Sequence, residues 1–341
     1  FCIINEGKRG ICGVRKNIKG KLYSLVYGKA IGLAIDPVEK KPLFHFLPGK
    51  EVLSFGTVGC NFRCDFCQNF EMSQEPKDDN DNENTEKIKK EDKNNKEEYS
   101  VGGKDISPKH IVEYALENKI PMIAYTYNEP AVFIEYALET AKLAKKNGIK
   151  NIYVTNGYES EEALQLMKPY IDAMNIDLKS FSDKFYNKLC GAKLQPVLDT
   201  IKRAHEAGIW IEITTLVIPG ENDSKEELEQ IANFIASLEK NKQGINGKRI
   251  PWHISRFFPM YKMQDTEITP ESKLKEAYDI GRKAGLKYVY VGNIILEGKE
   301  NTYCPICNSI VIERSRYQLG NINIKEGRCI KCQRKISGIF L

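Results

Sequence analysis

The sequence predicts an α/β fold in which parallel strands form a barrel or partial barrel, followed by a small C-terminal module. Helical patterns alternate with short apolar runs over residues 105–295, and residues 301–341 carry two close cysteine pairs. Alternation over this length favours a parallel sheet covered by helices. Six or seven strand–helix units favour a barrel or partial barrel over a small open sheet.

The expected elements follow one another in a regular order. The apolar runs predict strands at 52–58, 122–126, 150–155, 172–177, 209–217, 251–257 and 287–291. The helical patterns lie at 107–118, 131–147, 160–168, 195–207, 224–240 and 271–284. Several of these helices end beside a glycine, which is the usual residue after a helix C-terminus. In barrels of this kind the active site lies at the C-terminal ends of the strands, so polar residues there are candidates for function.

The chain divides into three expected parts. Residues 1–50 form a lead-in with short strands, for example at 21–27, residues 51–300 form the barrel, and residues 301–341 form a zinc ribbon. Within the barrel, residues 76–104 are rich in Asp, Asn, Glu and Lys and nearly lack apolar residues. Such a stretch cannot bury enough surface to offset the entropy of ordering, so we expect a disordered insertion.

Composition narrows the class of protein. The 341 residues carry a net charge of +5 and are 41% hydrophobic, as in a globular enzyme. No apolar run approaches the roughly 20 residues that span a bilayer, so we expect no membrane association. The chain starts at Phe1 rather than a methionine, which leaves open what precedes it. Most of the ten cysteines fall in short-spaced groups, which indicates metal binding in a reducing cytoplasm.

Three cysteines, Cys60, Cys64 and Cys67, follow the first expected barrel strand in a C-x3-C-x2-C pattern. Three thiolates on one short loop can bind three irons of a 4Fe-4S cluster and leave the fourth iron open to a small molecule. The alternatives are part of a zinc site or a buried group of thiols. Zinc sites more often use paired C-x2-4-C knuckles, which makes the cluster the preferred interpretation.

The spacing of these cysteines, with Phe62 and Phe66 between them, resembles that of the radical S-adenosylmethionine (SAM) enzymes. The resemblance implies that the open iron binds SAM through its amino and carboxylate groups. Reductive cleavage of SAM then yields a 5′-deoxyadenosyl radical that abstracts hydrogen from a substrate. It also implies a radical SAM partial or near-complete barrel, with Phe66 beside SAM.

Three further segments at strand ends carry the resemblance. Asn128-Glu129-Pro130 is similar to the Gly-Gly-Glu-Pro segment that holds the SAM amino group, although its glycines are replaced here by Tyr127 and Asn128. The segments 154–157 and 175–179 resemble those beside SAM in pyruvate formate-lyase activating enzymes. The SAM contacts so implied are Asn128, Glu129, Thr155, Asn156, Asp177 and Lys179.

Other interpretations of these segments stay open. Glu129 and Pro130 could open a helix, since acidic residues and proline both suit a first turn. Asp177 and Lys179 could form a surface ion pair or a helix cap. Val154 stands where the activating enzymes carry an acidic residue, which puts a monovalent-cation site built from that acid in doubt.

The last barrel strands contain two candidate catalytic residues, His253 and Arg256, in an otherwise apolar run. They are three positions apart, so they should point to opposite faces of the strand. Arg256 lies nearer the C-terminal end and is a candidate substrate-site residue. His253 is a second candidate, with a hydrogen-bonded core histidine as the alternative.

The C-terminal module carries two C-x2-C knuckles, formed by Cys304, Cys307, Cys329 and Cys332. Four thiolates form a closed tetrahedral site, which favours structural zinc. Rubredoxin-like iron is the alternative. A final strand at 336–341 would close this ribbon.

Two cysteines near the start of the chain, Cys2 and Cys12, remain. Two thiolates are too few for a closed metal site. They could complete a second metal site with cysteines upstream of Phe1, or be ordinary thiols.

Taken together, these segments are similar to the radical SAM enzymes of the AmmeMemoRadiSam system. The similarity covers nearly the whole chain outside 76–104, for example in 41–49, 125–130 and 252–257. It implies a cytoplasmic enzyme with a 4Fe-4S cluster and SAM, an electron donor such as ferredoxin or flavodoxin, and a possible protein partner encoded nearby. Its substrate is unidentified.

Three alternatives remain: an activase that installs a glycyl radical on a partner protein, an electron-transfer iron–sulfur protein, and a zinc-ribbon binding module. Residues 301–341 lack a dense basic stripe with aromatic residues, so nucleic acid is not an expected partner.

Overall fold

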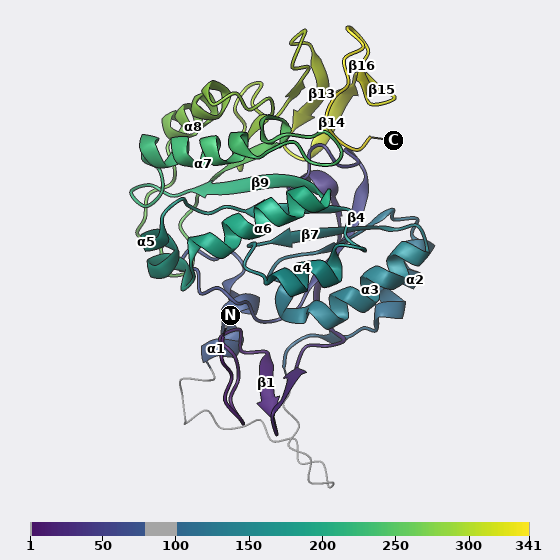
Figure 1. The fold of residues 1–341 in the computed structure, drawn as a ribbon, viewed down its shortest axis with the longest axis vertical. Coiled ribbons are helices and arrows are strands. Elements are labelled where there is room, and N and C mark those ends of the chain that lie inside the picture. The colour runs from purple at the N-terminus through teal and green to yellow at the C-terminus, as the bar shows by residue number, and fades with distance from the viewer. Residues whose placement is uncertain (1, 79–100, 341) are drawn as a thin grey trace.

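The computed structural model of the chain describes residues 2–78 and 101–340, and its centre is a nine-stranded sheet (Figure 1). The strand order is β11-β10-β9-β8-β7-β6-β4-β3-β5. Its parallel strands are β4 (Glu51–Gly56), β6 (Met122–Tyr125), β7 (Lys150–Thr155), β8 (Ala173–Asp177), β9 (Trp210–Val217), β10 (Trp252–Arg256) and β11 (Val289–Gly292). Each strand pairs with the next one along the chain, so the predicted α/β partial barrel is confirmed.

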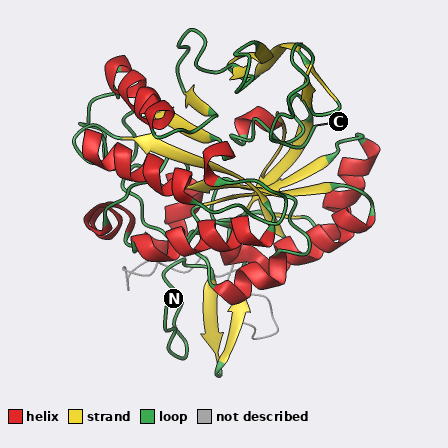
Figure 2. Cartoon of the chain, turned by 45° about the horizontal axis from the view of Figure 1, so that its top comes forward, coloured by secondary structure: helices red, strands yellow, loops and turns green. Residues whose placement is uncertain are grey.

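Helices cover the outer face of this sheet, as Figure 2 shows around the fan of strands. They are α2 (Pro108–Glu117), α3 (Ile134–Lys146), α4 (Glu161–Met167), α6 (Leu194–Ala207), α7 (Lys225–Ser237) and α8 (Glu271–Lys283). Ser107, Ser160 and Ser224 cap three of them, each accepting a hydrogen bond from a backbone N–H three residues on. Such caps satisfy donors that have no partner within the helix. All six expected helices are present.

Two antiparallel strands that the sequence analysis did not anticipate extend the sheet beyond β4. They are β3 (Lys29–Pro37) and the short edge strand β5 (Lys104–Asp105). Lys29 pairs with Asp105 in the ladder, and their side chains form an ion pair of 2.7 Å. Charged residues are tolerated on β5 because an edge strand needs only backbone partners on one side.

The expectation of disorder over 76–104 therefore needs correction at its ends. Helix α1 (Phe70–Asp78) reaches into this range from one side, and β5 begins within it from the other. The polar composition of these ends suggested disorder. That inference was wrong because a backbone ladder or a helix can order polar residues without an apolar face. The rest of the expectation, residues 79–100, lies outside the described residues.

The inner face of the sheet is filled by residues 38–47, which we call the plug. Leu43 and Phe46 are fully buried there against residues from the first halves of the barrel strands, such as Met122 and Ile152. The Asn175 side chain on β8 donates a 2.8 Å hydrogen bond to the carbonyl of Pro42. Residues 29–47 thus belong to the barrel, and the plug leaves space only toward the C-terminal ends of the strands.

The C-terminal module consists of small antiparallel sheets packed on the plug. Its strands are β12 (Thr302–Tyr303), β13 (Ile310–Ser315), β14 (Gln318–Ile322), β15 (Ile324–Lys325) and β16 (Arg328–Cys329). The expected final strand at 336–341 is not formed within residues 336–340. Instead, Ile339 makes a single parallel bridge to Phe46, because the plug offers it a backbone partner.

An N-terminal hairpin of β1 (Arg15–Ile18) and β2 (Lys21–Ser24) lies at the opposite end of the molecule from the C-terminal module (Figure 1). The expectation of short strands near 21–27 is met by β2. Every helix within residues 2–78 and 101–340 is too short or too polar to cross a lipid bilayer.

Candidate active site

A cavity of about 780 Å³ opens at the C-terminal ends of the parallel strands. Ten of the sequence-predicted site residues line it: Cys60, Cys64, Phe66, Cys67, Asn128, Thr155, Asn156, Asp177, Lys179 and His253. Two predicted residues, Glu129 and Arg256, are not among its lining residues. The cavity therefore brings together residues that are almost 200 positions apart in the sequence.

The cysteine loop follows β4 and is fixed by contacts on both sides. Gly59 has a φ of +87°, and a Cβ there would lie 2.6 Å from the carbonyl oxygen of Cys12, so this position requires glycine. The Asn128 side chain donates a 2.6 Å hydrogen bond to the carbonyl of Gly59. Further along, the backbone N–H of Arg63 donates to the carbonyl of Cys190 at 2.8 Å. Cys190 therefore supports the loop through its backbone.

The surroundings of the loop thiols suit metal ligation. Burial raises the pKa of the Cys67 thiol, while its 3.1 Å hydrogen bond with Ser73 acts in the opposite direction. The Asn156 amide lies 3.8 Å from the sulfur of Cys60. A buried cation close by would favour thiolates, which are the form that binds iron.

Lys179 is that cation. Burial opposes its charge, but Asp177 and the thiols of Cys64 and Cys190 hold the pKa of Lys179 well above its usual value. Its Nζ lies 2.9 Å from Asp177 and 5.7 Å from the ring centre of Phe66. The ion pair considered in the sequence analysis exists, but it lies in the cavity beside the cysteine loop.

Glu129 does not line the cavity, but it organises the end of β7. Its buried carboxylate accepts hydrogen bonds from the Thr155 hydroxyl at 2.9 Å and the Asn156 N–H at 2.8 Å. It also caps the short 3-10 helix η2 (Pro130–Phe133) by accepting from the N–H of Ala131 at 3.0 Å. Burial raises the pKa of Glu129 to about 7 despite these donors. Glu129 thus both opens a helix and orients two cavity residues.

A second buried carboxylate, Glu159, was missed by the sequence analysis. Neither of its oxygens has a hydrogen-bond partner among the described residues, and it is only 3% exposed. Burial, with the nearby charge of Glu129, raises the pKa of Glu159 to about 8. It follows a glycine turn in a polar stretch, where nothing in the local sequence signals burial.

His253 on β10 lines the cavity and is anchored by a residue that the sequence analysis missed, Glu212 on β9. The His253 Nε2 lies 2.7 Å from a carboxylate oxygen of Glu212. Glu212 is fully buried, which opposes its charge, but hydrogen bonds led by that from His253 keep its pKa below the usual value. The only sequence signal for Glu212 was a charge inside the apolar run 209–217.

Arg256 lies on the same strand, but its side chain makes different contacts. Its Nε donates a 2.8 Å hydrogen bond to the carbonyl of Thr269, and its guanidinium lies 5.5 Å from the ring centre of Phe258. His253 and Arg256 therefore face different surroundings, as their spacing implied.

Other lining residues come from the plug and from the C-terminal module. Lys41 is 3% exposed and pairs with Asp36 at 2.7 Å, and Arg316 and Tyr317 come from the turn between β13 and β14. Sequence reasoning missed them because contacts between segments more than 250 residues apart leave no local pattern. The C-terminal module is therefore part of the cavity wall.

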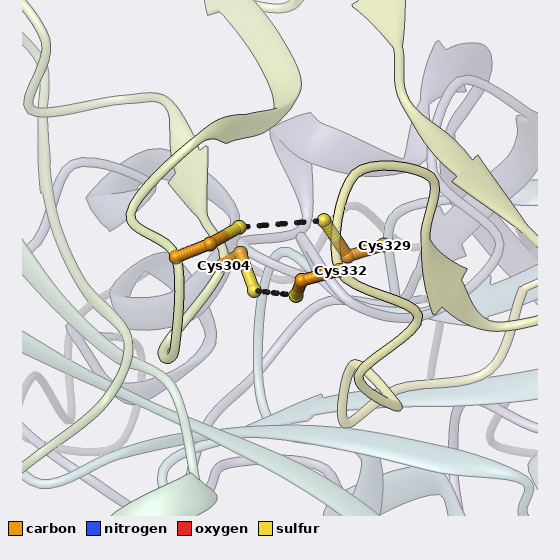
Figure 3. Close-up of side chains that lie close together, drawn as sticks. Cys304, Cys329 and Cys332 are labelled. Atoms are coloured by element: carbon orange, nitrogen blue, oxygen red, sulfur yellow. Dashed lines mark hydrogen bonds between the residues drawn. The ribbon is translucent and has the colours of Figure 1, made fainter.

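The four ribbon cysteines are brought together as the sequence predicted. The sulfurs of Cys304, Cys307, Cys329 and Cys332 all lie within 4.8 Å of one another. The sulfurs form two close pairs, 3.5 Å apart between Cys304 and Cys332 and 3.7 Å apart between Cys307 and Cys329. Figure 3 shows the first pair, with Cys329 beside it. Hydrogen bonding with Ser309 lowers the pKa of the Cys307 thiol, which favours the ligating form. This group could hold one tetrahedral metal ion.

Of the two N-terminal cysteines, Cys12 lies beside the cysteine loop. Cys12 is buried with its carbonyl against Gly59, whereas Cys2 is exposed. The Cys2 sulfur lies 3.5 Å from the position that a Cβ on Gly10 would take. A second metal site at Cys2 and Cys12 stays a prediction.

Proteins similar in sequence to this chain were found over nearly its whole length. A protein of Methanocaldococcus jannaschii named "Uncharacterized protein MJ0808" is 42% identical over 337 residues, which cover 98% of this chain and 92% of that protein. The pyruvate formate-lyase-activating enzyme of Clostridium pasteurianum is 23% identical, with 64% of this chain and 84% of that enzyme covered. This second similarity is distant.

A solved structure, that of Streptococcus suis SuiB bound to S-adenosylmethionine, shares the fold. The TM-score is 0.51 at 12% sequence identity, and the match covers 75% of this chain and 53% of that chain. The family model described as the radical SAM superfamily matches residues 55–235, which run from β4 through the cysteine loop into α7. The chain therefore belongs to the radical SAM superfamily of enzymes.

Proposed function

We propose that the chain binds a 4Fe-4S cluster on Cys60, Cys64 and Cys67 and uses SAM to abstract hydrogen from a substrate in the cavity. Membership of the superfamily implies the cluster and SAM. The observation that carries the assignment to these residues is that all three cysteines line the same cavity as Asn156 and Lys179. When bound, the reduced cluster and SAM supply a 5′-deoxyadenosyl radical for hydrogen abstraction.

The remaining predicted residues have separate tasks in this proposal. Asn128 and Asn156 hold the cysteine loop through the carbonyl of Gly59 and the side chain of Asn61. Phe66, Thr155, Asp177 and Lys179 shape the pocket for SAM, with Lys179 balancing the negative charge of the thiolates. Glu129 acts through Thr155 and Asn156 rather than by touching SAM, because it does not line the cavity.

We place the chain in the AmmeMemoRadiSam branch of the superfamily, on the sequence segments quoted above. A reduced ferredoxin or flavodoxin would supply the electron, and a protein encoded nearby would be a partner. We propose a cytoplasmic location, because iron–sulfur assembly and free thiols suit a reducing compartment. For the ribbon cysteines we propose structural zinc over iron, since four thiolates form a closed site.

A second candidate function is activation of a partner protein by installing a glycyl radical. The distant similarity to the pyruvate formate-lyase-activating enzyme supports it. Under this alternative the hydrogen atom would come from a glycine of the partner. A deuterated peptide or deuterated small molecules, followed by mass analysis of 5′-deoxyadenosine, would separate the two candidates.

The experiment that tests the proposed function is anaerobic reconstitution followed by reduction in the presence of SAM. We expect about four irons per chain on the three cysteines, an EPR signal that changes when SAM is added, and 5′-deoxyadenosine as a product. A variant with Cys60, Cys64 and Cys67 all replaced by Ala should lose all three properties. Retention of the SAM-sensitive signal by that variant would show that the cluster lies elsewhere.

A further inference from the structure

The wall of the cavity that faces the cysteine loop is built around one buried acid. Glu212 accepts hydrogen bonds from the backbone N–H groups of Phe44 and His45 at 3.0 and 2.8 Å, and from the indole of Trp210 at 3.0 Å. The two backbone donors tie the plug to β9, and the Trp210 indole lies on β9 itself. The fourth donor, His253, is the only one of the four that comes from β10. The first three donors would be enough to hold Glu212 in its place in the fold.

The ring of His253 is held in one orientation. It stacks on Tyr290 with ring centres 5.2 Å apart, and Phe44 meets it edge-on at 4.7 Å. The Glu212 carboxylate can only accept hydrogen bonds, so the His253 Nε2 carries a proton, and in the neutral imidazole this tautomer leaves a lone pair on Nδ1. This Nδ1 has no hydrogen-bond partner within residues 2–78 and 101–340.

The polar neighbours of His253 are already engaged. The Tyr290 hydroxyl is bonded to His45 at 2.6 Å and to Thr302 at 2.8 Å. The Thr214 hydroxyl, beside His253 in the strand register, is bonded to Asn175 at 2.8 Å. His253 therefore offers an acceptor that its neighbours leave unused, in the same cavity as the cysteine loop.

We propose that Glu212 and His253 form a substrate-binding dyad, in which the His253 Nδ1 accepts a hydrogen bond from a hydroxyl or amino group of a small polar substrate. Glu212 is the positioning residue, because it fixes the tautomer that leaves Nδ1 unprotonated. SAM also carries hydroxyl and amino groups, but His253 lies on β10, two strands beyond β8, the last strand that contributes a predicted SAM contact. We therefore assign the dyad to the substrate. This inference rests on the proposed function and adds the chemical class of its substrate.

The test is acylation of histidines by diethyl pyrocarbonate, which reacts with an imidazole nitrogen that has an accessible lone pair. The chain provides internal controls among its four histidines. His110 is exposed. His45 and His205 are buried and do not line the cavity, whereas His253 is only 5% exposed but lines it. In the reconstituted enzyme with SAM, we expect peptide mass analysis to find His110 and His253 modified and His45 and His205 intact. An unmodified His253 beside a modified His110 would overturn the proposal.

The positioning role of Glu212 is tested by Glu212→Gln. A glutamine can donate to Nε2 and so favours the tautomer with the proton on Nδ1, which would slow acylation of His253 about 5- to 10-fold, the factor for one hydrogen bond. If His45 and His205 stay unacylated in the variant, the variant is folded. Glu159→Gln, a change at a buried carboxylate outside the cavity lining, should leave the rate unchanged. If His253 is acylated at the parent rate in folded Glu212→Gln, then Glu212 does not position His253.

The substrate class is tested with small probes at equal concentration. Alcohols and primary amides, which donate hydrogen bonds without consuming the reagent, should protect His253 but not His110 from acylation, several-fold more than carboxylates of the same size. Equal protection by the carboxylates, or protection by none of the probes, would overturn the assigned class. The acylation results do not depend on SAM cleavage. A parent enzyme that forms no 5′-deoxyadenosine would therefore refute the proposed function, while an unreactive His253 in an enzyme that cleaves SAM would refute only this inference.

Discussion

At the scale of single residues, two buried carboxylates lie behind the cofactor end of the cavity. Glu129 has four hydrogen-bond contacts through three donor groups, whereas Glu159 has no hydrogen-bond partner among the described residues. Burial raises the pKa of both carboxyl groups, and the charge of Glu129 raises that of Glu159 further, so the two are not easily charged together. The neutral form of one of them is therefore part of the folded state near neutral pH.

Replacement of Glu159 by Gln should make stability less dependent on pH. The pKa of Glu159 rises from 4.5 to about 8 on folding, so the folded state binds more protons than the unfolded state between these values. The parent should lose stability as pH rises from about 4.5 to 8, whereas the variant should not. We expect about 2–4 kcal/mol in favour of Glu159→Gln at pH 8.5 and little difference at pH 5, measured by anaerobic urea unfolding. Parallel curves for the two proteins would contradict this.

Replacement of Glu129 by Ala should weaken SAM binding and leave iron content intact. The variant removes the acceptor that orients Thr155 and Asn156. A hydrogen bond to a charged group is worth about 1.5–3 kcal/mol. We therefore expect a roughly 10- to 100-fold loss of SAM affinity, measured by equilibrium binding to the reconstituted enzyme. Glu135→Ala, at a half-exposed ion pair with Arg15, is the control. Unchanged affinity in Glu129→Ala would reduce Glu129 to a helix cap.

At the scale of elements, the cysteine loop depends on neighbours from three other parts of the chain. Cys12 packs on Gly59, Asn128 binds its carbonyl, and the turn ending at Cys190 accepts a hydrogen bond from Arg63. Apart from Gly59, no residue in the loop has a positive φ, so these contacts rather than local backbone preference hold the thiols in place.

Gly59→Ala tests this dependence. The new Cβ would combine an unfavourable positive φ with a 2.6 Å approach to a backbone oxygen, so the loop must shift. We expect iron content after reconstitution to fall several-fold. Gly220→Ala is a matched control, because its φ is +74° but no atom lies within 4 Å of the added Cβ. Equal iron in the two variants would show that the loop tolerates movement.

The regular elements were predictable because each carries its own periodic pattern. Strands such as β7 and helices such as α6 have the apolar spacing and the end residues that their conformations need. The short β5 and the plug could not be predicted in this way, because their order comes from partners elsewhere in the chain. For the same reason, the cysteines could be predicted from their local motif, whereas Glu212 and Arg316 have no such motif and were missed.

At the scale of the whole molecule, the C-terminal module and the barrel share one buried polar interface. Arg314 on β13 is 5% exposed and donates to the carbonyl of Phe44 at 2.7 Å and to the Thr302 hydroxyl at 2.6 Å. Its guanidinium also lies 4.3 Å from the ring centre of Phe44. The four-cysteine group of the module packs in the same cluster as Phe44 and Tyr290, which line the cavity.

Cys329→Ser should loosen this interface as well as the ribbon. Loss of one thiolate should remove the metal, since closed four-ligand sites bind metal and fold together. We expect loss of one zinc per chain by elemental analysis and faster proteolysis within residues 301–341, with the iron of the cysteine loop retained. Lys331→Ala, an exposed position between the last two ribbon cysteines, is the control. Equal zinc in the two variants would show that the four sulfurs are not a metal site.

The plug also determines when the chain can finish folding during its synthesis. His45 is made early, yet its ring is bonded to the carbonyl of Ser337, 292 positions later, and the backbone of Leu47 is bonded to that of Ile339. A ribosome covers the most recently made residues of a growing chain, so the plug has no final partner until residues 337–339 have emerged. Contacts of such long sequence separation form late and slowly. The newly made barrel should therefore reach its closed state only after residues 337–339 have been made and have left the ribosome.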